Sequence, residues 1–483
     1  MISHRLCLQI LAAFCFVLAC APASVFAANA DAKAGKVKVY ILSGQSNMVG
    51  IGQVTGGGDR WGKEFSDPVL SVYAGGYDPK ADYDKMTAAK TLKLESFGGV
   101  TPTPYPGGGT QIVRGEFAPK ETGTYEFRPG YGDSEHNIMF VDGKEVYRKE
   151  PGKKAATYTN LKLTGGKKVP FKITYLTANA NGLGWYARID IHGTLATVVK
   201  QDGKFPYLID KEGNWVERKD VWYKGVVTAT ANKWLSIGCG AGANNIGPEL
   251  GFGHIVGNHH AARNEPVLIL KASQGNRSLA WDFLPPGSER FTHEGRTYAG
   301  YKDTPDSWVE GEAKKEVDWY AGKQYDDCFG AAHQVLANFD KEFPHWKGRG
   351  YEIAGFFWWQ GHKDTGSALT AGRYEQNLVH LIKTLRKEFK TPDVPFVVAS
   401  IGFEGRKMTG PTLTVAEAQL AVSGEKGKYP QFKGNVKSVD TRDYWRDASV
   451  SPKNQGFHYN QNAETYMLVG EASGKAMVEL LGR

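Results

Sequence analysis

Four short segments of the chain are rich in apolar and β-branched residues and are bounded by turn-forming residues, which is typical of buried strands. They are residues 36–42, 266–270, 353–359 and 395–401. Residues 319–339, 374–389 and 463–481 are predicted to be helices, the second of them from its apolar residues at helical spacing. Strands that alternate with helices predict a parallel, doubly wound α/β sheet, which places ligands at the carboxyl ends of its strands.

Residues 67–198 follow a different pattern, with apolar and polar positions that alternate with a period of two. Within them, residues 139–147 (MFVDGKEVY) predict a hairpin that turns at Asp142-Gly143, because both central residues of a type I′ turn take a positive φ. The aromatic residues available for a separate core are Tyr125, Phe127, Phe140, Phe171, Tyr175 and Trp185. We therefore predict an all-β module at 67–198, inserted into an α/β domain made of residues 28–66 and 199–483.

The first 27 residues have the pattern of a signal peptide. Arg5 precedes an apolar run at 8–18 that is too short to span a membrane, and Val25-Phe26-Ala27 offers a cleavage site. We expect export to the periplasm or beyond the cell. Lipid attachment at Cys20 is a less favoured alternative, since a bulky leucine lies two residues before it.

Export leaves Cys239 and Cys328 in the mature chain, where they form either one disulfide or two buried thiols. Hydrophobic residues make up 41% of the sequence and charged residues 23%, which indicates a globular protein. The net charge of +8 becomes 8 − 1 = +7 without Arg5, and it is scattered rather than clustered, so nucleic-acid binding is not expected. No Walker loop or H-E-x-x-H pattern occurs, and we expect neither a metal nor an organic cofactor. The oligomeric state stays open.

The first predicted strand runs directly into the segment 41–50, ILSGQSNMVG. Ser46 therefore lies at a carboxyl strand end, where a serine is either an exposed nucleophile or the cap of a helix. The G-x-S-x-G pattern of the α/β-hydrolases does not fit, because Met48 takes the place of the last glycine.

Four blocks of the sequence resemble the SGNH hydrolases, specifically the sialate O-acetylesterase and acetyl xylan esterase group (carbohydrate esterase family six). They are Gly44 to Asn47 (GQSN), Lys271 to Leu279 (KASQGNRSL), Trp358 to Asp364 (WWQGHKD) and Phe457 to Tyr459 (FHY), in the order of that group. The resemblance implies a flavodoxin-like SGNH fold and an esterase that removes O-acetyl groups from carbohydrate through an acetyl-enzyme.

The resemblance also implies roles for individual residues. Ser46 is the expected nucleophile and His458 its general base. The Ser46 and Gly275 N–H groups and the Gln360 side-chain amide are the expected oxyanion donors.

The third member of the catalytic triad is not fixed by the sequence. The family pattern Asp-x-x-His would place an aspartate where Gln455 stands, and an amide carries no charge to stabilise an imidazolium. Asp364 is the favoured substitute, with Asp440, Glu464 or the neutral Gln455 itself as alternatives.

Residues beside the four blocks are expected to contact substrate: Gln45, Asn47, Asn276, Arg277 and Trp359. The inserted module resembles the β-sandwich of the anthrax protective-antigen type, and serves either as a spacer or as a glycan-binding unit. Two other functions stay open. One is a catalytically impaired glycan-binding protein, which the replacement of the aspartate by Gln455 suggests. The other is a related SGNH lipase or thioesterase.

Overall fold

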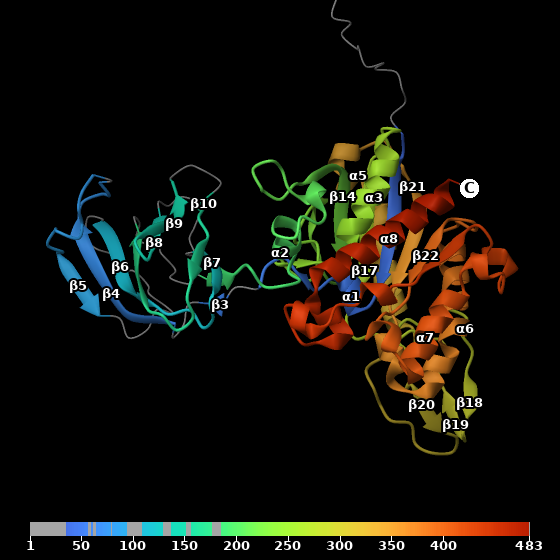
Figure 1. Ribbon diagram of the computed structural model, residues 1–483. Coiled ribbons are helices and arrows are strands. Elements are labelled where there is room, and N and C mark those ends of the chain that lie inside the picture. Colours follow the sequence, from blue (N-terminus) through green and yellow to red (C-terminus); the bar gives the residue numbers. More distant parts are fainter. Residues whose placement is uncertain are drawn as a thin grey trace, which may run out of the picture.

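The computed structural model describes residues 35–56, 59–60, 64–78, 80–93, 109–128, 137–150, 156–175 and 185–482. It has mixed α/β architecture with several sheets (Figure 1), in which an α/β body and a separate β-module lie beside each other. The expected signal peptide at 1–27 and Cys20 lie outside the described residues.

A seven-stranded sheet forms the centre of the α/β body. Its strands lie in the order β15, β14, β17, β1, β21, β22, β23, and all neighbouring pairs are parallel except β15 with β14. Gly44 at the end of β1 faces Ser273 of β17 and Trp359 of β21, so three carboxyl strand ends meet at one place. The bounds are β1 (Val37–Gly44), β14 (Arg218–Val226), β15 (Asn232–Leu235), β17 (Val267–Ser273), β21 (Tyr351–Trp359), β22 (Phe396–Ala399) and β23 (Val436–Val439).

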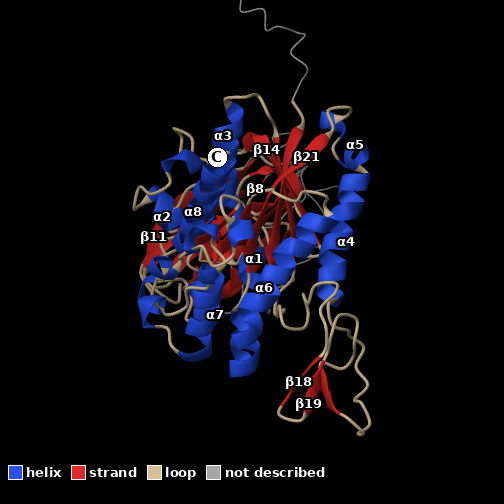
Figure 2. Ribbon diagram, turned by 90° about the vertical axis from the view of Figure 1, so that its right-hand side faces the viewer, coloured by secondary structure: helices blue, strands red, loops and turns tan. Residues whose placement is uncertain are grey.

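Helices cover both faces of this sheet. Figure 2 shows α3 and α8 on one side of it and α4 on the other, and α3 packs closely against α8. The helices are α1 (Ser46–Val49), α2 (Leu195–Lys200), α3 (Glu249–Ala261), α4 (Lys323–Ala337), α5 (Phe339–Glu342), α6 (Ala368–Glu388), α7 (Gly410–Ala421) and α8 (Ala463–Leu481). The helix predicted at 374–389 begins earlier, because the Ser367 side chain accepts a hydrogen bond from the Thr370 N–H and caps α6.

The β-module consists of two antiparallel sheets around an apolar core that includes Phe117, Phe127 and Phe171. Asp142 (φ 51°) and Gly143 (φ 72°) turn the hairpin between β8 and β9, as predicted. One sheet contains β4 (Phe65–Ala74), β5 (Lys90–Lys93), β6 (Gly109–Phe117), β8 (Asn137–Val141), β9 (Lys144–Lys149), β10 (Thr157–Tyr158) and β12 (Val169–Tyr175), and the other β3 (Asp59–Arg60), β7 (Gly123–Arg128), β11 (Leu161–Leu163) and β13 (Trp185–Arg188).

Smaller features complete the body. β2 (Gly52–Gln53) pairs with β16 (Asn245–Ile246), and β18 (Phe291–His293), β19 (Arg296–Tyr298) and β20 (Ser307–Val309) form a small sheet beyond the end of α6. Cys239 and Cys328 are free, buried thiols, so the disulfide alternative is not realised. Among the described residues, no helix has the length and apolar character needed to cross a membrane.

A buried ion pair fixes the elements around the carboxyl end of β1. The ammonium of Lys271, with no exposed surface, donates to Glu249 Oε2 at 2.8 Å, to the Val49 carbonyl at 2.8 Å and to the Cys239 carbonyl at 3.0 Å. Glu249 Oε1 accepts from the Gly247 N–H at 2.8 Å. Since Val49 ends α1 and Glu249 begins α3, one lysine from β17 holds both helices to the sheet.

Removal of this cation should strongly destabilise the α/β body. Lys271→Met leaves the Glu249 carboxylate buried without a counter-charge, which typically costs about 3–5 kcal/mol of unfolding free energy. Urea unfolding followed by tryptophan fluorescence measures the loss. Lys168→Met is the control, because its pair with Glu116 is exposed and should contribute little to the free energy of unfolding. An equal effect of the two substitutions would contradict a structural role for the buried pair.

Candidate active site

The chain turns sharply between β1 and α1, and this turn presents Ser46. Gly44 has a φ of 155°, and a Cβ atom at this position would lie 2.1 Å from the Trp359 carbonyl oxygen, so no larger residue fits. Gln45 and Asn47 are buried on either side, whereas Ser46 is partly exposed. The turn therefore directs the one hydroxyl of this segment that solvent can reach away from the core.

His458 meets Ser46 from a different part of the chain. It lies in η9 (Gly456–Gln461), directly before α8, and its Nε2 is 2.9 Å from Ser46 Oγ. Asn47 fastens the two segments, since its Nδ2 donates to the Phe457 carbonyl at 3.1 Å and its Oδ1 accepts from Tyr466 Oη at 2.8 Å. The serine and histidine singled out from the sequence thus lie within hydrogen-bonding distance of each other.

The imidazole of His458 is held in its neutral form. Burial, and to a smaller extent the neighbouring His362, lower its pKa to about 4. Since a nearby carboxylate would raise the pKa, these causes agree with the contacts: in the described part of the chain no carboxylate hydrogen bonds to His458.

The residues considered as the triad acid have other partners. Asp440 pairs with Arg442 and Arg406, and Glu464 pairs with Arg446 and Lys204. Gln455 Oε1 accepts from Gln461 Nε2 at 2.7 Å.

Asp364, the favoured acid, contacts the opposite side of the site and not His458. It is fully buried and accepts from the Leu279 N–H at 2.8 Å, the Ala280 N–H at 2.8 Å and Gln360 Nε2 at 2.7 Å. Burial raises the pKa of Asp364 to about 6, although the bonds it accepts act in the other direction. The expectation that Asp364 orients His458 is thus corrected: its carboxylate orders the loop after β17.

The side chain of Gln360 also differs from its expected role as an oxyanion donor. Its Nε2 donates to Gln45 Oε1 at 3.1 Å, to the Arg277 carbonyl at 2.9 Å and to Asp364. The two N–H bonds of this buried amide therefore already have protein acceptors, and none points to Ser46. Gln360 is part of the scaffold rather than a free oxyanion donor.

Two backbone groups remain for an oxyanion. A Cβ atom added to Gly275 would lie 3.6 Å from Ser46 Cβ, which places this glycine directly beside the serine. Within the described residues, neither the Gly275 N–H nor the Ser46 N–H has a protein acceptor. Free N–H groups beside a nucleophile are the donors that an oxyanion needs.

The residues expected to contact substrate divide into buried and accessible ones. Trp359 is 1% exposed and donates to the Ser400 carbonyl, so the expected stacking on a sugar is wrong for this indole. Gln45 and Asn47 are likewise buried and serve as links inside the site. Asn276 is exposed with a φ of 56°, and Arg277 is half-buried, so these two remain accessible to a ligand.

An aromatic rim at the site was not found from the sequence. Phe457 is 42% exposed and stacks on His362, with ring centroids 5.2 Å apart and an interplanar angle of 13°. Phe403 contacts His362 edge-on at 5.4 Å. Both Phe457 and His362 lie inside recognised blocks, but only the folded chain brings the two blocks together.

The contacts of Asp364 predict two separable effects of its removal. In Asp364→Ala the Leu279 and Ala280 N–H groups lose their acceptor, so their hydrogen exchange should accelerate at least about tenfold. The pKa of His458 should stay within about 0.3 units, because the two side chains share no contact. NMR of ¹³C-labelled histidine, with His458→Gln to assign the signal, measures this pKa. A clear fall of the His458 pKa would instead restore Asp364 as its partner.

Two family models match parts of the chain. The family of carbohydrate esterases described as sialic acid-specific acetylesterases matches residues 179–478, and the PA14 domain matches residues 77–204. No curated protein matches the chain.

Solved structures with some similarity include a carbohydrate acetylesterase from Xanthomonas citri (12% identity, 77% of this chain and 72% of that one, TM-score 0.34). A protein from Arabidopsis thaliana has 16% identity over 55% of this chain and 87% of its own, with a TM-score of 0.33. A carbohydrate esterase family 2 enzyme from Corynascus thermopiles has 11% identity over 86% and 100%, with a TM-score of 0.27. Because the family match covers most of the chain and includes Gly275, Gln360, Asp364 and His458, this protein belongs to the sialic acid-specific acetylesterase family of carbohydrate esterases and carries a PA14 domain.

Proposed function

We propose that this protein is an exported serine esterase that removes O-acetyl groups from carbohydrate by way of an acetyl-enzyme. The 2.9 Å contact between Ser46 Oγ and His458 Nε2 carries the proposal. A serine hydroxyl is a weak nucleophile at neutral pH, and an imidazole at this distance is positioned to accept its proton. The carbohydrate substrate rests on the family, and the export on the leader predicted at 1–27.

The first half of the reaction forms the acetyl-enzyme. Ser46 Oγ bonds to the ester carbonyl carbon while its proton moves to His458 Nε2. The carbonyl oxygen becomes an oxyanion, and the Ser46 and Gly275 N–H groups donate to it. Collapse of this intermediate breaks the bond to the sugar oxygen, which takes the proton from His458 and leaves as an alcohol.

The second half regenerates the enzyme. Water gives a proton to His458 Nε2 and bonds to the acetyl carbon, and a second oxyanion forms on the same donors. Its collapse releases acetate, and the proton on His458 returns to Ser46 Oγ. The chemistry requires no metal or organic cofactor.

In this proposal the machinery is a serine–histidine pair without a third acid. Neutral partners such as Gln455 give no charge to the imidazolium that forms in each step, although a triad carboxylate contributes up to about 10⁴-fold to the rate. Asp364 acts as a positioning residue, since it orders the loop that carries Gly275. Asn276 and Arg277 are the proposed substrate contacts beside the oxyanion donors.

The same proposal assigns the architecture. Six strands of the central sheet are parallel. Five of them, β17, β1, β21, β22 and β23, follow the order 2-1-3-4-5 when they are numbered along the chain, which supports a flavodoxin-like SGNH domain in which the parallel strand β14 and the antiparallel edge strand β15 are additions. The bounds predicted at 67 and 198 shift by a few residues, because β3 (Asp59–Arg60) and the start of β4 belong to the sheets of the module, whereas Leu195 and Val199 of α2 lie in the core of the α/β body. We therefore assign residues 28–56 and 195–483 to the SGNH domain and 59–188 to the inserted module.

A second candidate function is glycan binding with little turnover. The missing acid beside His458 and the amide of Gln360, which is bound to other protein groups, favour it. It predicts carbohydrate binding without acetate release, whereas the lipase alternative predicts activity that rises with acyl length.

Substitution of the pair tests the esterase directly. Ser46→Ala removes the nucleophile and His458→Ala the base, so each should lower kcat by about 10³-fold or more on acetylated xylan, O-acetylated sialic acid and p-nitrophenyl acetate. His293→Ala, an exposed histidine of β18, is the control and should leave kcat unchanged. A wild-type protein that matches Ser46→Ala on every substrate would leave glycan binding as the function.

The low pKa of His458 predicts activity well below neutral pH. The base works only when it is neutral, so kcat/KM should fall as the pH drops through about 4 and should stay level between pH 5 and 7. A histidine with the ordinary pKa of about 6.5 would lose roughly nine-tenths of the activity by pH 5.5. Acetate release across this range, with circular dichroism at each pH to confirm folding, distinguishes the two. A half-maximal rate near pH 6.5 would contradict the low pKa and show that burial does not hold the imidazole neutral.

A further inference from the structure

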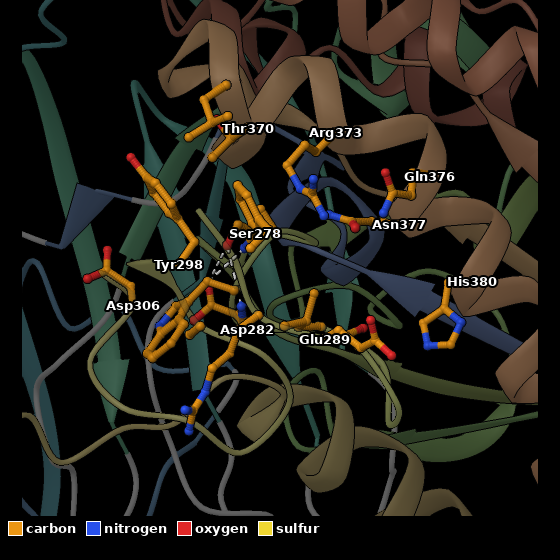
Figure 3. Close-up of a pocket in the computed structure, with 18 of the residues that line it drawn as sticks. Ser278, Asp282, Glu289, Tyr298, Asp306, Thr370, Arg373, Gln376, Asn377 and His380 are labelled. Carbon is orange, nitrogen blue, oxygen red and sulfur yellow. Dashed lines mark hydrogen bonds between the residues drawn. The ribbon is translucent and has the colours of Figure 1, made fainter. Parts of the chain in front are cut away.

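A large cavity lies beside the candidate active site and has no part in the mechanism above. Its volume is about 770 Å³, and its walls come from α6, the small sheet β18–β20 and the loop after β17 (Figure 3). Neither Ser46 nor His458 lines it. A cavity of this size accommodates a group as large as a sugar ring.

Two polar side chains of α6 face this cavity without protein partners. Asn377 is 6% exposed, yet within the described residues its amide makes no hydrogen bond. Arg373, one turn earlier on the same face of the helix, has no hydrogen bond or ion pair there either. Figure 3 shows the two side chains next to each other at the cavity. An amide and a guanidinium that face a cavity and make no hydrogen bond to the protein are available to a ligand with polar groups of its own.

Aromatic contacts hold Arg373 in place. Its guanidinium lies 3.5 Å from the ring centroid of Phe291, and that ring stacks on Tyr298 at 4.9 Å with an interplanar angle of 10°. The stack joins α6 to the strands β18 and β19. The contact with Phe291 thus orders the guanidinium and leaves its N–H groups free. Because the side chain is already ordered, the entropy cost of binding a ligand is lower.

The charges of the cavity favour a neutral ligand. Arg373 and Lys363 are its cations without an ion pair in the described structure, and the carboxylates of Glu289 and Asp306 also line it. Charged side chains of both signs surround the indole of Trp281. These side chains match the hydroxyl groups of a sugar ring, and the indole matches its apolar face. An anion would instead leave the carboxylates unfavourably placed.

The cavity and the nucleophile share a wall. Ser278 and Ala280 line the cavity and belong to the loop that carries Gly275, and the Ala280 N–H is held by Asp364. Lys363 also lines it, and its N–H donates to Gln45, the residue before Ser46, at 3.3 Å. A ligand here lies beside an ester held at Ser46 and does not compete with it.

We propose that this cavity is a subsite for a neutral sugar unit of the same glycan whose acetyl ester is presented to Ser46. The preferred substrate is then an acetylated oligosaccharide and not an acetylated monosaccharide. This inference rests on the proposed esterase function, which it makes more specific.

The test compares chain lengths. Acetylated xylohexaose, mannohexaose and galactohexaose are each compared with the acetylated monosaccharide. For at least one series kcat/KM should be about tenfold higher for the hexasaccharide, which corresponds to about 1.4 kcal/mol of additional binding. Arg373→Met combined with Asn377→Ala should abolish this advantage and leave p-nitrophenyl acetate cleavage within about twofold of wild type. Arg263→Met, an exposed arginine after α3, is the matched control and should keep the advantage.

Each other outcome overturns the subsite. Equal kcat/KM for hexasaccharide and monosaccharide in every series, or an equal loss on p-nitrophenyl acetate in the double variant, excludes it. If the protein instead prefers acetylated oligogalacturonate, and Arg373→Met removes this preference, the cavity binds an acidic sugar unit and the proposal of a neutral one is wrong. Calorimetric titration of the Ser46→Ala protein with the three hexasaccharides separates the two proposals. Binding that depends on Arg373 and Asn377 supports the subsite even where wild type releases no acetate, and absence of binding excludes it.

Discussion

The buried ammonium of Lys271 is the constraint on which the geometry of the site depends. Ser46 lies on α1, a helix of four residues that is far too short to be stable alone. Lys271 donates to the carbonyl of Val49, the last residue of that helix, and pairs with Glu249 at the start of α3. A cation at the C-terminal end of a helix also interacts favourably with the helix dipole. The strand β17 thereby fixes the position of Ser46, which lies more than 200 residues earlier in the chain.

A second buried charge, the carboxylate of Asp364, orders the loop that carries the proposed oxyanion donor Gly275, as Lys271 orders the helix that carries Ser46. Asp364 gathers two backbone N–H groups of the loop after β17 and the amide of Gln360, which in turn contacts Gln45. Three donors bind this carboxylate, so its removal affects loop order before it affects His458. The two charges hold the neighbours of Ser46 and leave its N–H and its hydroxyl available to the site.

The hydrophobic pattern predicted β1, β17, β21 and β22 of the central sheet and the helices α4, α6 and α8, and the four ordered blocks singled out Ser46 and His458, because these are local features of the sequence. The strands β14 and β15 of the same sheet were not predicted. The partners of Asp364, Gln360 and Trp359 were not predictable in this way. The sequence does not distinguish a buried carboxylate from an exposed one. The burial of Trp359 against Ser400 depends on β22, which lies 40 residues away in the chain. The rim of Phe457 and His362 likewise exists only because η9 folds back onto the loop after β21.

Among the described residues, no carboxylate hydrogen bonds to His458, and this has two consequences that cannot be separated. An imidazole without a counter-charge in a half-buried site stays neutral to low pH, which keeps the base available. The same imidazole is a weaker base, and by the Brønsted relation it accepts the Ser46 proton less readily. A carboxylate at Gln455 would reverse both effects, since it would stabilise the imidazolium and raise the pKa. For the proposed esterase, this arrangement implies activity over a wide pH range at the expense of rate.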